Sequence, residues 1–384
     1  LVPAPRRARL HRMTAPLFIG SGIYRGSSYG PRHPLRVPRV PTVIDLARAL
    51  GWLPGEIYRP SPRAKPAALA TFHDPAYLAA LERAEREQSV TEAVRARHGL
   101  GTLSNPVFPE MFRRPATAAG GSMLAAEIAA GGGRVFNPGG GTHHGFADRA
   151  AGFCYLNDPV LALLRLRALG LERIAYVDID AHHADGVEAA LAGVEGMLLI
   201  STHEERRWPF TGALEDRAGG VALNLPLPRG AHDGDFARAL DEVILPAVAA
   251  HRPQAIVLQC GADAVTEDPL SRLGWSNASH AAAVRALAPM APGFVLLGGG
   301  GYNPWSVARA WTRAWAALAG HEMPARLPPA AEAVLRGLTW SHRLGRDVPE
   351  AWMTTLADAP REGPPTEGVA PRLRQLADRL RVWV

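Results

Sequence analysis

The segment Ile174-Ala-Tyr-Val-Asp-Ile-Asp-Ala-His-His-Ala-Asp-Gly186 limits the possible folds of this chain more than any other stretch. It starts as an apolar run that is typical of a buried strand, and it ends with three carboxylates and two imidazoles. Side chains alternate along a strand, so Asp178, Asp180 and His182 are expected to point to one side where the strand ends. An unpaired buried carboxylate is strongly destabilising. The segment therefore predicts half of a metal site.

The rest of the chain alternates short apolar strands with helices. This pattern predicts a single α/β domain with a mostly parallel central sheet and helices on both faces. We expect strands at Leu17–Gly20 and at residues 67–72, 135–136, 173–177, 196–201, 255–259 and 293–297. We expect helices near residues 41–50, 75–87, 115–130, 157–170, 185–192, 235–250, 278–289 and 304–318, with weaker ones near 329–337 and 371–382.

Composition excludes several classes of protein. The apolar fraction is 47%, and no run approaches the roughly 18 uncharged apolar residues of a membrane span. The net charge is +6, but Lys65 is the only lysine and the arginines are spread along the chain, so nucleic acid is not an expected partner. Cys154 and Cys260 form no Cys-x-x-Cys pair and are expected to be reduced thiols in a cytoplasmic protein.

Five polar or glycine-rich segments follow predicted strands. Open α/β sheets gather their ligand sites at the carboxyl ends of their strands, so these segments should meet at one edge. They comprise residues 137–145, 178–185, 201–204, 259–263 and 297–303. A lone His-His pair or Gly-Ala-Asp turn is usually structural, and only their joint position supports a functional reading.

Three of these residues are candidate metal ligands, namely Asp180, His182 and Asp263. One histidine and two carboxylates leave a fourth position open, which is the pattern of a catalytic zinc site rather than a structural one. No thiolate is offered. Iron(II), cobalt or manganese could occupy the same ligands.

The remaining polar residues suggest acid–base chemistry. His143 and His144 lie on a glycine-rich loop, and paired histidines near a metal-activated water suit general base and general acid roles. Asp178 and Asp185 could each accept the Nδ1–H of one histidine and fix its tautomer. Tyr302 follows four glycines and could donate a hydrogen bond to an oxyanion.

Nearby His183, His203 and Cys154 are expected to have supporting or core roles instead.

Together these segments resemble the histone deacetylase family of zinc amidohydrolases, a group that includes acetylpolyamine amidohydrolases and acetoin utilization proteins and shares the arginase/deacetylase fold. The resemblance covers about residues 17–320, and its motifs follow the family's order. It rests on His33-Pro with Arg39, Pro138-Gly-Gly-Gly-Thr-His-His144, Gly152-Phe-Cys-Tyr-Leu-Asn-Asp158, Asp178–Gly186, Gly261-Ala-Asp263 and Gly298-Gly-Gly-Gly-Tyr302.

The resemblance implies roles for individual residues. One zinc ion would be held by Asp180, His182 and Asp263. The tandem histidines 143 and 144 would pair with Asp178 and Asp185 respectively, and Tyr302 would donate to the oxyanion as metal-activated water hydrolyses an amide. The acyl-lysine tunnel would be lined by Gly152 and Phe153, with Trp208 or Phe210 opposite. Arg39 would belong to a cavity for acetate release. A structural potassium ion would bind near Asp178, Asp180, His182, Ser201 and Thr202.

Two positions bear on the substrate. Relatives often carry an aspartate that holds the substrate backbone where this chain has Ser104 or Asn105. Acetylpolyamine-specific relatives place an acidic residue at the tunnel mouth, where this chain has Leu270. The resemblance therefore favours removal of acetyl or other acyl groups from lysine in peptides or proteins. The alternative is hydrolysis of acetylpolyamines or another small acylated amine; arginase-type hydrolysis with two manganese ions and a catalytically silent binding module are disfavoured.

The chain is expected to divide into three parts. Residues 1–12 are expected to be a disordered extension, residues 13–320 the deacetylase catalytic domain, and residues 321–384 a Pro-rich and helical tail. The tail is expected to pack on the domain or to form an interface, including one between copies of the chain.

Overall fold

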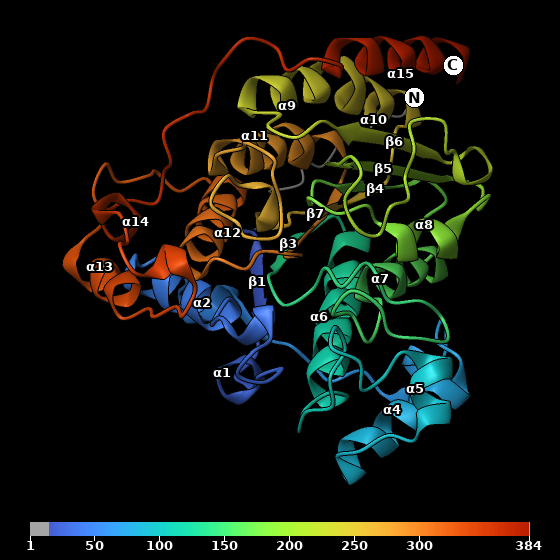
Figure 1. Ribbon diagram of the computed structural model, residues 1–384. Helices are drawn as coiled ribbons and strands as arrows, with labels where there is room; N and C mark the ends of the chain where they lie inside the picture. Colours follow the sequence, from blue (N-terminus) through green and yellow to red (C-terminus); the bar gives the residue numbers. More distant parts are fainter. Residues whose placement is uncertain (1–14, 384) are drawn as a thin grey trace, which may run out of the picture.

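The computed structural model describes residues 15–383 and contains one open sheet of eight parallel strands (Figure 1). The strand order is β2-β1-β3-β8-β7-β4-β5-β6, and every neighbouring pair is parallel. The strands are β1 Leu17–Gly20, β2 Tyr58–Pro60, β3 Arg134–Asn137, β4 Ile174–Asp178, β5 Met197–Glu204, β6 Ala222–Leu227, β7 Ala255–Gln259 and β8 Gly293–Leu297.

Helices cover both faces of this sheet. They are α1 Ile23–Gly26, α2 Val40–Ala49, α3 Pro66–Leu69, α4 Pro75–Glu87, α5 Glu92–His98, α6 Arg113–Ala130, α7 Asp158–Ala168, α8 Asp185–Leu191, α9 Asp233–Ala239, α10 Leu245–His251, α11 Asn277–Leu287, α12 Pro304–Ala319, α13 Pro329–Arg336, α14 Glu350–Thr354 and α15 Val369–Trp383. The alternation along β4 separates two cores. Ala175 and Val177 pack towards α2 and α9–α12, whereas Ile174 and Tyr176 pack towards α6–α8.

This architecture confirms the predicted α/β fold with a parallel sheet covered on both faces. One element was predicted wrongly. Residues 67–72 do not form a strand, because Pro66 occupies the first position of the short helix α3 and the following alanines favour a helix. Strands β2 and β6 and helix α5 were not predicted at all.

The C-terminal helices pack on the helices α2, α9 and α12 and on the edge strand β6. Helices α13 and α14 share a buried cluster with Trp305 of α12 and Leu46 of α2. Helix α15 contacts β6 and α9 and lies over α9 and α10 in Figure 1. The predicted extension at residues 1–12 lies outside the described residues. Within residues 15–383, no helix combines the length and apolar character needed to cross a membrane.

Candidate active site

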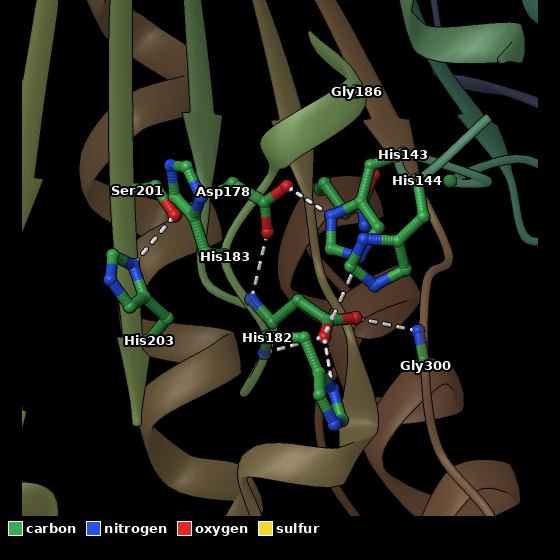
Figure 2. A network of polar contacts seen from close by, with 12 residues as sticks. His143, His144, Asp178, His182, His183, Gly186, Ser201, His203 and Gly300 are labelled. Carbon is green, nitrogen blue, oxygen red and sulfur yellow. Dashed lines mark hydrogen bonds and ion pairs between the residues drawn. The ribbon is translucent and has the colours of Figure 1, made fainter. Parts of the chain in front are cut away.

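The carboxyl end of β4 places Asp178 at the centre of a polar network (Figure 2). β4 runs between β5 and β7, so the loop that follows it is surrounded by other strand ends. The Oδ2 atom of Asp178 lies 2.8 Å from His143 Nδ1 and accepts a hydrogen bond of 2.5 Å from the Tyr176 hydroxyl. Its Oδ1 atom accepts from the backbone N–H of Asp180 at 2.9 Å. Asp178 therefore orients a histidine and shapes the loop that carries the next carboxylate.

Asp180, His182 and Asp263 converge on one point. One ligand atom from each lies within 4.8 Å of the others, and all three residues are buried. His182 Nδ1 is 3.2 Å from Asp180 Oδ1 and 3.0 Å from Asp263 Oδ2. The Gly300 N–H donates to Asp180 Oδ2 at 2.6 Å, and the Ala181 N–H donates to Asp263 Oδ1 at 3.0 Å. Backbone donors thus fix both carboxylates before any ion binds.

The electrostatics of this cluster fit a divalent cation. Burial and the neighbouring Asp180 raise the pKa of Asp263. Burial disfavours a charged His182, but Asp263 and Asp180 outweigh it and raise the pKa of His182 to about 10. The two carboxylates thus hold a proton on the imidazole, which a divalent metal would displace on binding. Nitrogen and oxygen donors without a thiolate suit zinc, iron(II), cobalt or manganese.

Two glycines bring the metal-ligand loops into contact. A Cβ atom at Gly261 would lie 1.9 Å from Asp180 Oδ2, and one at Gly300 would lie 2.0 Å from Asp263 Oδ2. Neither position has a positive φ, so what excludes a side chain is space and not backbone conformation. This close approach is the physical reason for the glycines that precede Asp263 and Tyr302.

The tandem histidines lie side by side, each with its own carboxylate. Their ring centroids are 3.9 Å apart, and His144 Nδ1 is 2.6 Å from Asp185 Oδ1. Burial lowers the pKa of His144 and the adjacent His143 lowers it further, to about 4. Burial also opposes charge on His143, but Asp178 and Asp180 outweigh it and raise its pKa to about 9. Near neutral pH one imidazole is charged and the other neutral, a division that marks acid–base pairs.

Tyr302 stands at the edge of this group. Its backbone N–H donates to Asp268 Oδ2 at 2.6 Å, and its ring packs edge-on against Phe153 with centroids 5.7 Å apart. Burial, together with the carboxylates of Asp263 and Asp180, raises the pKa of the Tyr302 phenol well above its usual value. The hydroxyl therefore stays protonated and can act as a hydrogen-bond donor.

A cavity of about 250 Å³ leads to these residues. Its lining includes His144, His182 and Tyr302 at the base, and Ser104, Gly152, Phe153, Arg207, Trp208 and Leu270 around the walls. Gly152 is required there, because a Cβ atom would lie 2.3 Å from the Trp208 ring. Trp208 in turn packs edge-on against His144, with centroids 4.6 Å apart.

Two residues predicted for the tunnel do not line this cavity. Phe210 is 73% exposed, and Asn105 is buried beneath the wall, where its Nδ2 donates to the carbonyl of Cys154 at 3.4 Å. Sequence reasoning missed Arg207, which lines the cavity and is held by a bidentate ion pair to Glu204 at 2.7 and 2.8 Å. The only sign in the sequence that Arg207 lines the cavity is that it directly precedes Trp208, which was predicted to line the tunnel.

Arg39 lines a second, smaller cavity of about 50 Å³ that reaches His143, His144 and Tyr302. Its Nη1 donates to the carbonyl of Gly299 at 2.6 Å, and its guanidinium lies over the ring of Trp311. Burial lowers the pKa of Arg39. Its Nε has no hydrogen-bond partner among the described residues.

Of the residues predicted to hold potassium, Ser201 and Thr202 lie on β5, Asp178 ends β4, and Asp180 and His182 lie in the loop that follows β4. The Ser201 hydroxyl is 3.0 Å from His203 Nδ1, and the Thr202 hydroxyl donates to the carbonyl of Asp178 at 3.4 Å. Both ring nitrogens of His183 have a hydrogen-bond partner. Nδ1 lies 2.8 Å from Thr211 Oγ1, and Nε2 lies 3.0 Å from Glu188 Oε2. Figure 2 shows His183 and His203 on the side of Asp178 away from the tandem histidines. These contacts give His183 a structural setting.

Comparisons with known proteins agree with this geometry. Residues 33–318 match the histone deacetylase domain family. The chain is 36% identical over 320 residues to Histone deacetylase 9 of Arabidopsis thaliana, covering 79% of this chain and 73% of that protein. It is 30% identical over 351 residues to the acetoin utilization protein AcuC of Bacillus subtilis, covering 88% of this chain and 89% of that protein. It spans 60% of Histone deacetylase 3 of Oryza sativa, at 36% identity.

A crystal structure gives the same result for the fold. The structure of an HDAC homologue from Aquifex aeolicus matches with a TM-score of 0.89 and 34% identity, covering 95% of this chain and 100% of that one.

Proposed function

The chain belongs to the histone deacetylase family and is a hydrolase of the deacetylase class, and we propose that it removes acetyl or other acyl groups from lysine side chains. One observation carries this proposal. A convergent Asp180, His182 and Asp263 cluster lies beside two histidines whose pKa values are pushed to about 9 and about 4, at the base of a narrow cavity.

The metal we propose is zinc, held by Asp180, His182 and Asp263; iron(II), cobalt and manganese would suit the same donors. Bound there, a zinc ion would polarise the amide carbonyl and lower the pKa of a nearby water molecule. We further propose a structural potassium ion near Asp178 and Ser201. We place the catalytic domain within residues 13–320, with residues 321–384 as a segment that packs on it.

The residues around the metal cluster would carry the proton transfers. His144 is neutral near pH 7 and has Nδ1 held by Asp185, so its other nitrogen can accept a proton from the attacking water. The new C–O bond forms as the carbonyl becomes an oxyanion, to which Tyr302 donates a hydrogen bond. His144 then passes its proton to the lysine nitrogen as the C–N bond breaks, leaving a carboxylic acid and a free amine. The charged His143 stabilises the negative charge throughout.

The walls of the cavity favour acyl-lysine in a peptide over a polyamine. Apart from the residues at its base, the cavity is lined by Ser104, Gly152, Phe153, Trp208 and Leu270 together with one cation, Arg207. A second ammonium group on a polyamine would meet no carboxylate among the cavity's lining residues.

Two variants and two substrates test the proposal. Tyr302→Phe is expected to keep its zinc but to lose roughly 100-fold or more of its turnover, because only an oxyanion donor is removed. Asp180→Ala is expected to lose both zinc and turnover. Turnover of an acetyl-lysine peptide is expected to exceed that of an acetylpolyamine; a large preference for the polyamine would overturn the substrate assignment. Retained activity in both variants would overturn the residue roles.

A further inference from the structure

A wide groove opens beside the mouth of the active-site cavity. Its volume is about 1080 Å³, and it shares Ser104 and Phe153 with that cavity as a common wall. Pockets that hold drug-sized ligands measure roughly 300–1,000 Å³. The groove is therefore large enough for several residues of an extended peptide.

The common wall is fixed by packing and hydrogen bonding. His33 Nε2 lies 3.1 Å from the carbonyl oxygen of Ser104, and the His33 ring packs edge-on against Phe153 with centroids 4.5 Å apart. The Tyr29 ring stacks on His33 with centroids 4.8 Å apart, and its hydroxyl donates to the carbonyl of Phe153 at 3.2 Å. A chain that inserts one side chain into the tunnel would thus meet a rigid edge, with the groove directly beyond it.

Apolar side chains are exposed around this mouth. Leu103 is 97% exposed and lines the groove together with Val90 and Val107. Five large apolar side chains are exposed among residues 15–383, and two of them line these openings: Leu103 lines the groove and Trp208 lines the tunnel cavity. Single exposed apolar residues are common on protein surfaces, but Leu103 shares the groove with Val90 and Val107, and grouped apolar side chains mark an interaction site.

The charged residues that line the groove are both arginines. Arg32 and Arg95 line the groove, and none of the groove's lining residues is acidic. Arg95 has one ion pair, to Glu92 at 3.8 Å, and both side chains are solvent-exposed, so the pair compensates little of its charge. Arg32 forms no ion pair with any residue in the range 15–383. The groove therefore complements an anionic partner.

We infer that this groove is a subsite for the chain that flanks the acyl-lysine, and that it accepts a peptide segment carrying an apolar side chain and an aspartate or glutamate. This inference rests on the proposed function. The apolar side chain would contact Leu103 and the neighbouring valines, and the carboxylate would pair with Arg32 or Arg95. Peptides with flanking lysine or arginine would be repelled.

Acetyl-lysine peptides of equal length test the inference. Each carries a Leu-Asp, Leu-Lys or Ala-Ala pair next to the acetyl-lysine, first on its N-terminal side and, in a second set, on its C-terminal side. On one side, the Leu-Asp peptide is expected to have a KM about 5- to 10-fold lower than the Leu-Lys peptide, because the aspartate gains one exposed ion pair and the lysine is repelled by the same arginines. The ratio is expected to shrink with added salt. It should fall close to one in the double variant Arg32→Ala/Arg95→Ala. The control is Arg97→Ala, an exposed residue of α5 that lines neither cavity and should leave the ratio unchanged.

The two proposals fail in different ways. Equal KM values for the acidic and basic peptides, or an equal loss in Arg97→Ala, would overturn the subsite while leaving deacetylation intact. Failure to hydrolyse a capped acetyl-lysine amide and every peptide would overturn the proposed function. In that case fluorescence anisotropy of labelled peptides, with the same arginine variants, measures whether the groove binds the acidic one. Binding that does not depend on Arg32 and Arg95 would then reject the subsite.

Discussion

Gly300 offers a direct test of how tightly the metal-ligand loops must pack. In Gly300→Ala the new Cβ atom would lie 2.0 Å from Asp263 Oδ2, 2.6 Å from its Cγ and 2.9 Å from Asp180 Oδ2. The backbone φ at Gly300 is not positive, so the effect is expected to come from this overlap. Relief of the overlap requires a carboxylate or the loop to move by about 1 Å, and a misplacement of that size can cost roughly 100-fold in rate.

We expect two measurable consequences of Gly300→Ala. Zinc affinity, measured by competition with a chromogenic chelator, should fall by about 10- to 100-fold, as when the partners of metal ligands are disturbed. Deacetylation at saturating zinc should fall by roughly 100-fold. Overpacking should also cost about 1–3 kcal/mol in the free energy of unfolding, which leaves a folded protein to assay.

Gly55→Ala is the matched control, because a Cβ atom there meets no atom within 4 Å and the backbone φ is not positive. It should keep wild-type zinc affinity and turnover. Gly261→Ala is a second, independent probe, since its Cβ would press on Asp180 instead of Asp263. Wild-type zinc affinity and turnover in both Gly261→Ala and Gly300→Ala would show that the close approach of these glycines does not position the metal-ligating carboxylates.

Two further predictions follow from buried charges. The pH profile of kcat/KM should fall on the acid side as His144 becomes protonated and on the alkaline side as His143 loses its proton. Without a metal the pKa values of these two groups are about 4 and about 9, and a bound cation lowers both, so each limb is expected at or below the corresponding value. A profile that rises steadily to pH 10 would contradict these roles. Arg309→Ala should destabilise the fold by about 3–5 kcal/mol, measured by urea denaturation, because Arg309 is 2% exposed and pairs with Asp358 of the C-terminal segment at 2.6 Å. A loss below about 1 kcal/mol would show that this segment contributes little to stability.

Much of the fold could be predicted from the sequence because most strands are buried on both faces and read as apolar runs. Strand β6 escaped prediction since Asn224 and Pro226 interrupt its apolar pattern. As an edge strand it tolerates a proline, whose missing N–H faces no partner strand. The error at residues 67–72 has a similar origin, because a few small apolar residues do not distinguish a short helix from a strand.

The location of the site could be predicted from the sequence because most of its residues come at the ends of strands. Asp178, Asp180 and Asp263 follow strands of one parallel sheet, so their proximity follows from the topology. The difference in pKa between His143 and His144 could not be predicted, because it arises from burial and from distances of a few ångströms.

The groove could not be predicted either, because it forms where residues 30–34 meet residues 89–107. No local pattern in the sequence encodes that contact.

We propose that one metal ion, held by Asp180, His182 and Asp263, supports hydrolysis of acyl-lysine. The most direct test adds zinc stepwise to the metal-free protein and follows acetate release from an acetyl-lysine peptide. We expect acetate release to rise in proportion to bound zinc and to reach its maximum at one catalytic ion per chain. No acetate release at full zinc occupancy, or a requirement for two ions, would contradict it.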